Sequence, residues 1–133
     1  MTEHDRTRRV LARYCHYCDE GRFDLWSGLF TQGATFSVLG RTYEGRDNLR
    51  GFIADAQPPE RRGRHVISEP VIELDGDEAR AWTDYVFVGR VGDGFGITSV
   101  GRYHDHLVRE DDEWRIASRE IVFMGEQPAT ELL

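Results

Sequence analysis

The chain has 133 residues and a formal net charge of −7, with its acidic residues spread along it rather than collected in a tail. This balance disfavours nucleic acid as a partner, because phosphate binding needs clustered positive charge. The apolar content of 39% suits a single globular domain over residues 1–133, and no apolar run is long enough to cross a membrane. The charged N-terminus offers no secretory signal, so we expect a cytoplasmic protein.

The first predicted element is an amphipathic helix over residues 6–20, whose apolar side chains recur at helical spacings. Asp19 falls on the edge of this apolar stripe. A carboxylate turned toward a core must be paired or hydrogen-bonded, because desolvating a bare charge is costly. The alternative is that Asp19 simply ends the helix before Gly21 and faces water. The stripe consists of Val10, Leu11, Tyr14, Cys15 and Cys18.

The two cysteines of the chain lie in this stripe as a C-x-x-C pair, Cys15 and Cys18. A redox pair is expected at the N-terminus of a helix, where the thiolate is stabilised, and these residues come late in theirs. A zinc site needs two more ligands, for which His104 and His106 are the candidates. We therefore expect the cysteines to be reduced core residues, and we expect no metal and no cofactor.

Two more helices and a short hairpin are predicted before residue 60. Each helix has an aspartate that can cap its N-terminus, and a pair of prolines ends the second of them. The predicted elements are a helix from Asp24 to Phe30, a strand at 34–39, a turn at 40–41, a return strand at 42–44 and a helix from Asp47 to about Ala56.

From His65 onward the chain consists of long runs rich in Val, Ile, Tyr, Phe and Trp, separated by short Gly- and Asp-rich turns. These patterns predict four sequential antiparallel strands. Helices followed by a strand meander indicate an α+β fold: a cone-shaped barrel of a strongly curved, mostly antiparallel sheet, with three N-terminal helices closing a small-molecule pocket. The convex face of such a sheet needs a cover, so we expect a homodimer or homotrimer. The strands are expected at 65–74, 78–90, 97–109 and 114–123.

Three groups of residues carry a resemblance to a known family. Over about residues 6–123 the chain resembles the SnoaL-like branch of the nuclear transport factor 2-like superfamily, near the scytalone dehydratase group. This fold hosts lyases, isomerases, cyclases, hydrolases and proteins without catalytic activity, so the resemblance is more specific for fold than for reaction. The matching residues are the helix end at 17–24 with Leu29-Phe30-Thr31, the isolated His65, and the segment 101–109 followed by Trp114-Arg115-Ile116 and Arg119.

The resemblance implies roles for particular residues. Dehydratase-like members use an Asp at the end of the first helix to orient a His on the third strand, and Asp19 and His65 occupy those positions. The chain also resembles the related hexachlorocyclohexane dehydrochlorinase, which uses an Arg five residues after a strand tryptophan, and Arg119 matches that spacing from Trp114. Asp105 stands where relatives keep an amide, and Tyr14 stands where that relative has a lysine. These departures mean that the substrate and leaving group need not be those of the relatives.

An imidazole held by a carboxylate can remove an acidic C–H proton, as in dehydration, isomerisation or polyketide-type aldol cyclisation. Asp19 would fix the tautomer of His65, and Tyr103, Tyr43 or Arg119 would stabilise the developing oxyanion. We expect a small apolar organic substrate, of polyketide, aromatic or steroid-like type. The alternative is a non-catalytic ligand-binding or scaffold protein. The residues expected to contact the substrate are Tyr14, Trp26, Tyr43, Phe52, Tyr85, Tyr103, Asp105 and Arg119.

Several of these residues have a second interpretation. Tyr103 is equally compatible with an ordinary core position. In a regular strand the core residues Trp114 and Ile116 would put Arg119 on the opposite face, unless a bulge near residues 117–118 turns it inward. His104 and His106 share the opposite face from Tyr103, Asp105 and Leu107, and we expect them on the outer side of the sheet.

Two other enzyme types built on this fold are disfavoured. A ketosteroid isomerase-like site needs a carboxylate on the first strand, and residues 36–39 contain none. A limonene epoxide hydrolase-like site needs an Arg-x-Asp sequence on a central strand. Neither Arg80 with Asp84 nor Arg102 with Asp105 has that spacing.

Overall fold

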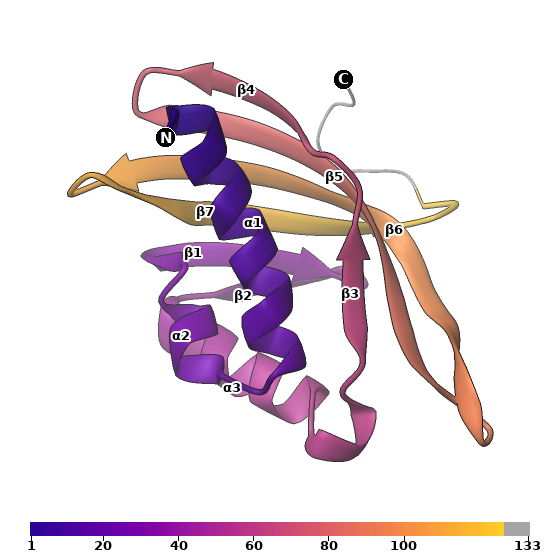
Figure 1. The fold of residues 1–133 in the computed structure, drawn as a ribbon. Coiled ribbons are helices and arrows are strands. Elements are labelled where there is room, and N and C mark those ends of the chain that lie inside the picture. The colour runs from indigo at the N-terminus through magenta and orange to yellow at the C-terminus, as the bar shows by residue number, and fades with distance from the viewer. Residues whose placement is uncertain (127–133) are drawn as a thin grey trace.

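Three helices lie against one face of a strongly curved sheet in the computed structural model, which describes residues 1–126 (Figure 1). The predicted α+β class and the order of helices before the strand meander are confirmed. The helices are α1 (Glu3–Asp19), α2 (Phe23–Ser27) and α3 (Arg46–Ala56), with a 3-10 turn at Pro59–Arg61; the strands are β1 (Phe30–Val38), β2 (Arg41–Glu44), β3 (Arg64–Ile67), β4 (Val71–Asp75), β5 (Glu78–Val91), β6 (Gly94–Glu110) and β7 (Glu113–Phe123).

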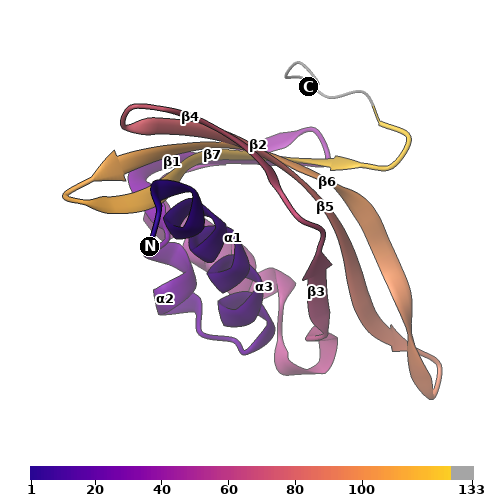
Figure 2. The same cartoon turned by 45° about the horizontal axis from the view of Figure 1, so that its top comes forward.

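The sheet is open, which corrects the expected barrel. Its strand order is β2-β1-β7-β6-β5-β3, with β4 also paired to β5, so β2 and β3 are at opposite ends of this order. The helices occupy the hollow of the sheet in Figure 2. Strand β1 runs parallel to β7, and this parallel contact joins the N-terminal hairpin to the C-terminal meander.

The expected strand 65–74 is two strands. Both β3 and β4 pair antiparallel with β5, but the ladder is interrupted at residues 68–70. Pro70 has no N–H to donate to a ladder, so a break there satisfies the backbone at lower cost than a continuous strand. The interruption leaves β3, which carries His65, as a short strand beside the end of α1.

Helix α1 begins three residues earlier than predicted because of its cap. The hydroxyl of Thr2 accepts a hydrogen bond from the Asp5 N–H at 3.0 Å, and the Asp5 carboxylate accepts one from the Thr2 N–H at 3.2 Å. This reciprocal pair satisfies two donors that a helix N-terminus otherwise leaves open. The helix ends at Asp19, shortly before Gly21 takes a left-handed φ of +73°.

Each aspartate expected to cap α2 or α3 is instead the second residue of its helix. The N-cap residues are Arg22 and Gly45, while Asp24 and Asp47 occupy the first helical turns. A carboxylate there still interacts favourably with the positive end of the helix dipole. Asp24 also forms an ion pair with Arg50, which ties α2 to α3.

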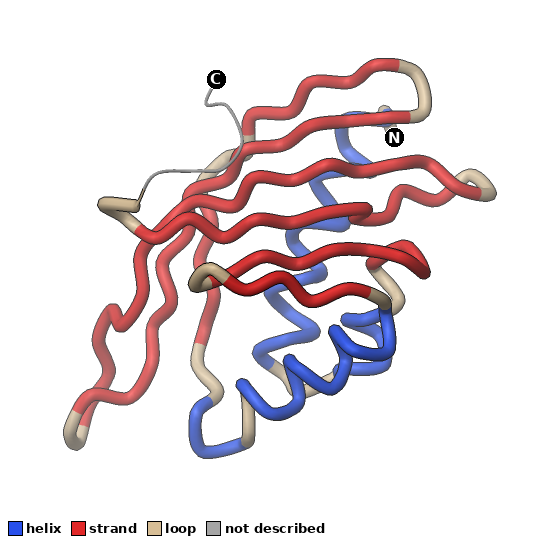
Figure 3. The backbone as a smooth tube through the Cα atoms, turned by 180° about the vertical axis from the view of Figure 1, so that it is seen from behind, coloured by secondary structure: helices blue, strands red, loops and turns tan. Residues whose placement is uncertain are grey.

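The core lies between the helices and the inner face of the sheet, and the other face of the sheet carries no helix from residues 1–126 (Figure 3). The homodimer or homotrimer expected from the sequence would cover this face, and it stays a prediction. No helix within the described residues is long and apolar enough to cross a membrane.

Candidate active site

Asp19 and His65 meet where the end of α1 lies beside β3. The Asp19 Oδ1 atom is 2.6 Å from the His65 ring nitrogen Nδ1, and Asp19 Oδ2 accepts the backbone N–H of His65 at 3.0 Å. One carboxylate therefore holds both the ring and the backbone of the same residue. A carboxylate can only accept, so Nδ1 is the donor in this pair and carries the proton, which leaves Nε2 as the basic nitrogen. The sequence predicts this pairing, although not the second hydrogen bond to the backbone.

The pair is largely buried. Asp19 is 8% exposed, so the alternative in which it faces water is wrong. The His65 side chain is 11% exposed, and its ring contacts the ring of Phe87, with centroids 4.6 Å apart. Tyr14 lies edge-on to the same ring at 6.2 Å. Aromatic neighbours of this kind exclude water from the imidazole and restrict its rotation.

Gly63 allows β3 to come close to β5. A Cβ atom at this position would overlap the carbonyl oxygen of Val88 and would stand 3.0 Å from the Phe87 ring. The clash is mainly with backbone, which cannot move without disturbing the ladder that positions His65. The glycine is therefore required by a close approach of two strands.

We expect Gly63→Ala to lower the free energy of unfolding by about 1–3 kcal/mol, because the added methyl group forces the strands apart. Urea unfolding measures the effect. Gly33→Ala in β1 is the matched control, since a Cβ there meets nothing within 4 Å. The control should stay within about 0.5 kcal/mol of the wild type. Equal effects of the two substitutions would contradict the role assigned to the close contact.

A bulge in β7 turns Arg119 toward the helices. Ile116 lies opposite Leu107, and Ser118 lies opposite His106, so Ala117 is an extra residue in the ladder. The extra residue reverses the alternation of side chains beyond it, and Arg119 is 1% exposed. The bulge interpretation is confirmed, and the solvated arginine is excluded.

The Arg119 guanidinium is enclosed by Asp105, Tyr14 and Tyr103. Its Nε donates to Asp105 Oδ1 at 2.7 Å, and its Nη2 donates to Asp105 Oδ2 at 2.8 Å. The guanidinium carbon lies 4.0 Å from the centre of the Tyr14 ring and 3.9 Å from that of Tyr103. Nη1 is buried and has no hydrogen-bond partner among residues 1–126. Burial alone lowers the pKa of Arg119, but the charge and hydrogen bonds of Asp105 outweigh it and raise this pKa, so the arginine stays protonated.

The tyrosines expected to contact the substrate belong to the same packed group. Tyr103 stacks on Tyr85 with centroids 4.4 Å apart and planes 3° from parallel, and the Tyr85 hydroxyl shares a 2.8 Å hydrogen bond with Ser99. Burial raises the pKa of Tyr14 and of Tyr103, so both are neutral phenols. Trp26 is also fully buried and contacts Tyr14. Side chains therefore fill the interior at this level of the hollow.

Tyr43 and Phe52 are half-buried and lie elsewhere in the hollow. They belong to β2 and α3, and their ring centroids are 4.3 Å apart. They line a groove of about 680 Å³ whose lining includes neither Asp19 nor His65. The described contacts thus bring Tyr14, rather than Tyr43, to the imidazole.

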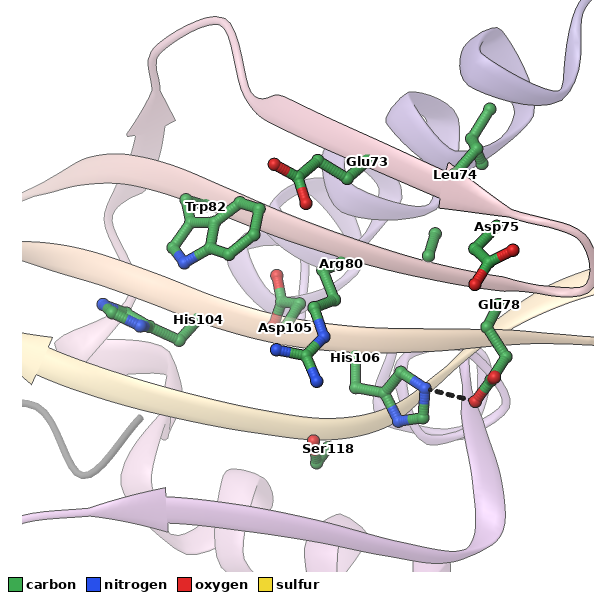
Figure 4. A pocket seen from close by; sticks show the side chains of 11 residues that line it. Glu73, Leu74, Asp75, Glu78, Arg80, Trp82, His104, Asp105, His106 and Ser118 are labelled. Carbon is green, nitrogen blue, oxygen red and sulfur yellow. Dashed lines mark hydrogen bonds and ion pairs between the residues drawn. The ribbon is translucent and has the colours of Figure 1, made fainter. Parts of the chain in front are cut away.

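The outer face carries a different groove, of about 590 Å³ (Figure 4). Its lining includes Trp82, His104 and His106, which confirms that both histidines lie away from the dyad. The His106 Nε2 atom is 2.9 Å from a carboxylate oxygen of Glu78. Within residues 1–126, no group of three or more His, Cys, Asp or Glu side chains is arranged to hold a metal ion.

Both cysteines are buried free thiols in α1, as predicted. Burial raises the pKa of Cys15 to about 12, and it also raises the pKa of Cys18. Neither thiol is a ready nucleophile at neutral pH.

The structure adds the pairing of Asp105 with Arg119, which the sequence does not predict. They are cross-strand partners only because of the bulge, since an unbroken hairpin register would place Asp105 opposite Ser118. The available signal was that Asp105 shares a strand face with Tyr103 and Leu107, and that a bulge near residues 117–118 would turn Arg119 toward the same side. The contact of Phe87 with His65 follows in the same way from the register of β3 with β5.

Comparisons with known proteins agree with this fold. A family profile described as a SnoaL-like domain matches residues 1–120. A protein of unknown function from Mycobacterium tuberculosis is 33% identical, with a TM-score of 0.84 over 89% of this chain and 69% of that one. No curated protein gives a significant match.

Two structures from Novosphingobium aromaticivorans share the fold at lower identity. An NTF2-like protein with a cystatin-like fold is 24% identical, with a TM-score of 0.85 over 94% of this chain and 84% of that one. A candidate scytalone dehydratase is 21% identical, with a TM-score of 0.80 over 90% of this chain and 83% of that one.

Proposed function

Because this chain belongs to the SnoaL-like domain family, we propose that it is a cofactor-independent enzyme in which Asp19 and His65 form a general base. The family includes dehydratases and polyketide cyclases. The observation that carries the proposal is the pair of hydrogen bonds that the Asp19 carboxylate accepts from the ring and the backbone of His65. The proposed substrate is a small apolar carbonyl compound with an acidic C–H bond, and the reaction is an elimination, an isomerisation or an aldol cyclisation.

The chemical step begins at Nε2 of His65. The Nδ1 proton stays hydrogen-bonded to Asp19, so Nε2 has a lone pair with which to take a proton from the carbon next to a carbonyl group. The electron pair of the broken C–H bond enters the enolate, and the imidazole becomes an imidazolium. The negative Asp19 stabilises this cation, and a general base placed in this way typically contributes about 10²–10⁴-fold to the rate.

The group that receives the proton from Nε2 distinguishes an elimination from an isomerisation. In an elimination the proton passes to a departing hydroxyl group on the neighbouring carbon, which leaves as water while the enolate re-forms the carbonyl. In an isomerisation it returns to a different carbon. The proposed donor for the enolate oxygen is Tyr14, which the sequence suggested only as a substrate contact. Its ring contacts that of His65, and burial raises its pKa, which keeps its hydroxyl protonated.

Hydrogen–deuterium exchange at carbon tests the proposal without knowledge of the leaving group. We expect the wild-type protein in D₂O to accelerate exchange next to the carbonyl in a panel of apolar aryl ketones and 1,3-diketones, as followed by NMR. His65→Ala should abolish the acceleration, because it removes the imidazole that takes the proton in the proposed step. His16→Ala, which removes an exposed histidine of α1, is the matched control and should keep the full rate.

The same panel separates the enzyme from a binding protein. A ligand that raises the melting temperature of the wild type, without any His65-dependent exchange across the panel, would replace the catalytic proposal by the ligand-binding one. Exchange that persists in His65→Ala would also refute the assignment of the base.

A further inference from the structure

We infer that Asp105 sets the charge selectivity of the proposed site: by neutralising Arg119 inside the fold, it makes the site accept neutral carbonyl compounds and discriminate against carboxylates. The inference rests on the proposed function for its catalytic readout. Its physical basis is the contact of Arg119 with Asp105, Tyr14 and Tyr103.

The ion pair between Asp105 and Arg119 is bidentate and buried. The two carboxylate oxygens of Asp105 face Nε and Nη2 of Arg119 at 2.7 and 2.8 Å, and the side chains are 0% and 1% exposed. Tyr14 and Tyr103 lie against the guanidinium carbon at 4.0 and 3.9 Å. Asp105 already neutralises the charge of Arg119 in this buried bidentate pair, so an external anion gains little by approaching the guanidinium.

Tyr14 links the Asp19–His65 pair to the Asp105–Arg119 pair, because it contacts both the His65 ring and the Arg119 guanidinium. Asp19 and Asp105 are acidic and Arg119 is basic, so with a neutral His65 these four side chains carry a net charge of about −1. The nearest ionised group to the ring is Asp19, at 2.6 Å from Nδ1. A substrate carboxylate near Nε2 therefore meets repulsion from Asp19 that Arg119 does not offset, because the charge of Arg119 is paired with Asp105; a neutral ketone or ester meets no such repulsion.

Asp105 determines whether the charge of Arg119 is compensated. Asp105→Asn keeps the size of the side chain but removes one negative charge, so the balance moves from net −1 toward zero and Arg119 loses its compensating charge. A buried, uncompensated guanidinium attracts an anion from solution or from the substrate. Asp19 cannot be used for this purpose, because it belongs to the catalytic pair.

The first experiment measures anion binding by thermal unfolding, with chloride as the probe. Sodium chloride is exchanged for sodium gluconate at constant ionic strength. We expect the melting temperature of Asp105→Asn to rise with chloride and that of the wild type to stay constant. Asp84→Asn is the matched control, because Asp84 accepts a hydrogen bond from Arg102 at 2.6 Å on the neighbouring strands but in an exposed pair. It should show no chloride dependence.

The second experiment compares two probes with one carbon skeleton, 3-benzoylpropionate and its methyl ester, in the carbon exchange assay. We expect the wild type to exchange the ester at least about tenfold faster than the carboxylate, after correction for the uncatalysed rates. In Asp105→Asn this ratio should fall by about tenfold. Asp84→Asn should keep the wild-type ratio.

The outcomes separate the inference from the proposed function. Wild-type stabilisation by chloride, a wild-type preference for the carboxylate, or an unchanged ratio in folded Asp105→Asn would each overturn the inference. If Asp105→Asn does not fold, the wild-type ratio of ester to carboxylate exchange still tests the inference. We expect this ratio to be at least about tenfold and to decrease at high ionic strength, and a smaller ratio or a constant one would overturn the inference. If no probe shows His65-dependent exchange, the proposed function fails, while the chloride dependence still supports or refutes the role of Asp105.

Discussion

Replacing Asp19 by asparagine lowers the rate of the proposed carbon exchange by about 10²–10⁴-fold and leaves the fold intact. The amide oxygen can still accept the backbone N–H of His65, so the local geometry survives. The amide nitrogen, however, can donate to Nδ1 and thereby favour the tautomer with its proton on Nε2. That tautomer presents an N–H where the substrate needs a base, and the imidazolium also loses its compensating charge.

Three measurements check this expectation. Exchange rates give the loss of activity, urea unfolding shows whether stability is retained, and ¹⁵N chemical shifts of His65 report which ring nitrogen carries the proton. Glu20→Gln is the matched control, because Glu20 is the exposed carboxylate next to Asp19 in the chain. An Asp19→Asn protein with wild-type exchange and an unchanged tautomer would refute the role of Asp19.

Replacing Arg119 by methionine lowers the free energy of unfolding by about 3–5 kcal/mol. The substitution leaves the Asp105 carboxylate buried without a cation and removes the contact of the guanidinium with two aromatic rings. The Asp105→Leu, Arg119→Met double variant should recover much of the loss, because no unpaired charge is then left in the core.

Urea unfolding of the two single variants and the double variant completes a thermodynamic cycle. Arg102→Met, which breaks the exposed pair with Asp84, serves as the control and should cost no more than about 1 kcal/mol. An Arg119→Met variant as stable as this control, or single effects that simply add in the double variant, would show that the buried pair does not stabilise the fold in the way described.

Features that depend on neighbouring residues in the chain were predictable from the sequence alone. The apolar stripe of α1 follows from helical spacing, and the turns after β4, β5 and β6 follow from their Gly and Asp residues. The order of these elements was enough for the α+β class. The pairing of Asp19 with His65 was predicted from a carboxylate on an apolar stripe together with a family resemblance. In the structure, Asp19 Oδ1 and His65 Nδ1 are 2.6 Å apart.

Features that depend on which strands become neighbours were decided only by the tertiary structure. The expected strand is split at Pro70, and β1 runs parallel to β7. The sheet is open because the strands at the two ends of its order, β2 and β3, do not pair with each other. The bulge at Ala117 reverses the alternation in β7, and only then does Arg119 meet Asp105. A single extra residue in a ladder changes no local pattern but moves every later side chain to the other face, so register is a property of the partner strand as much as of the strand itself.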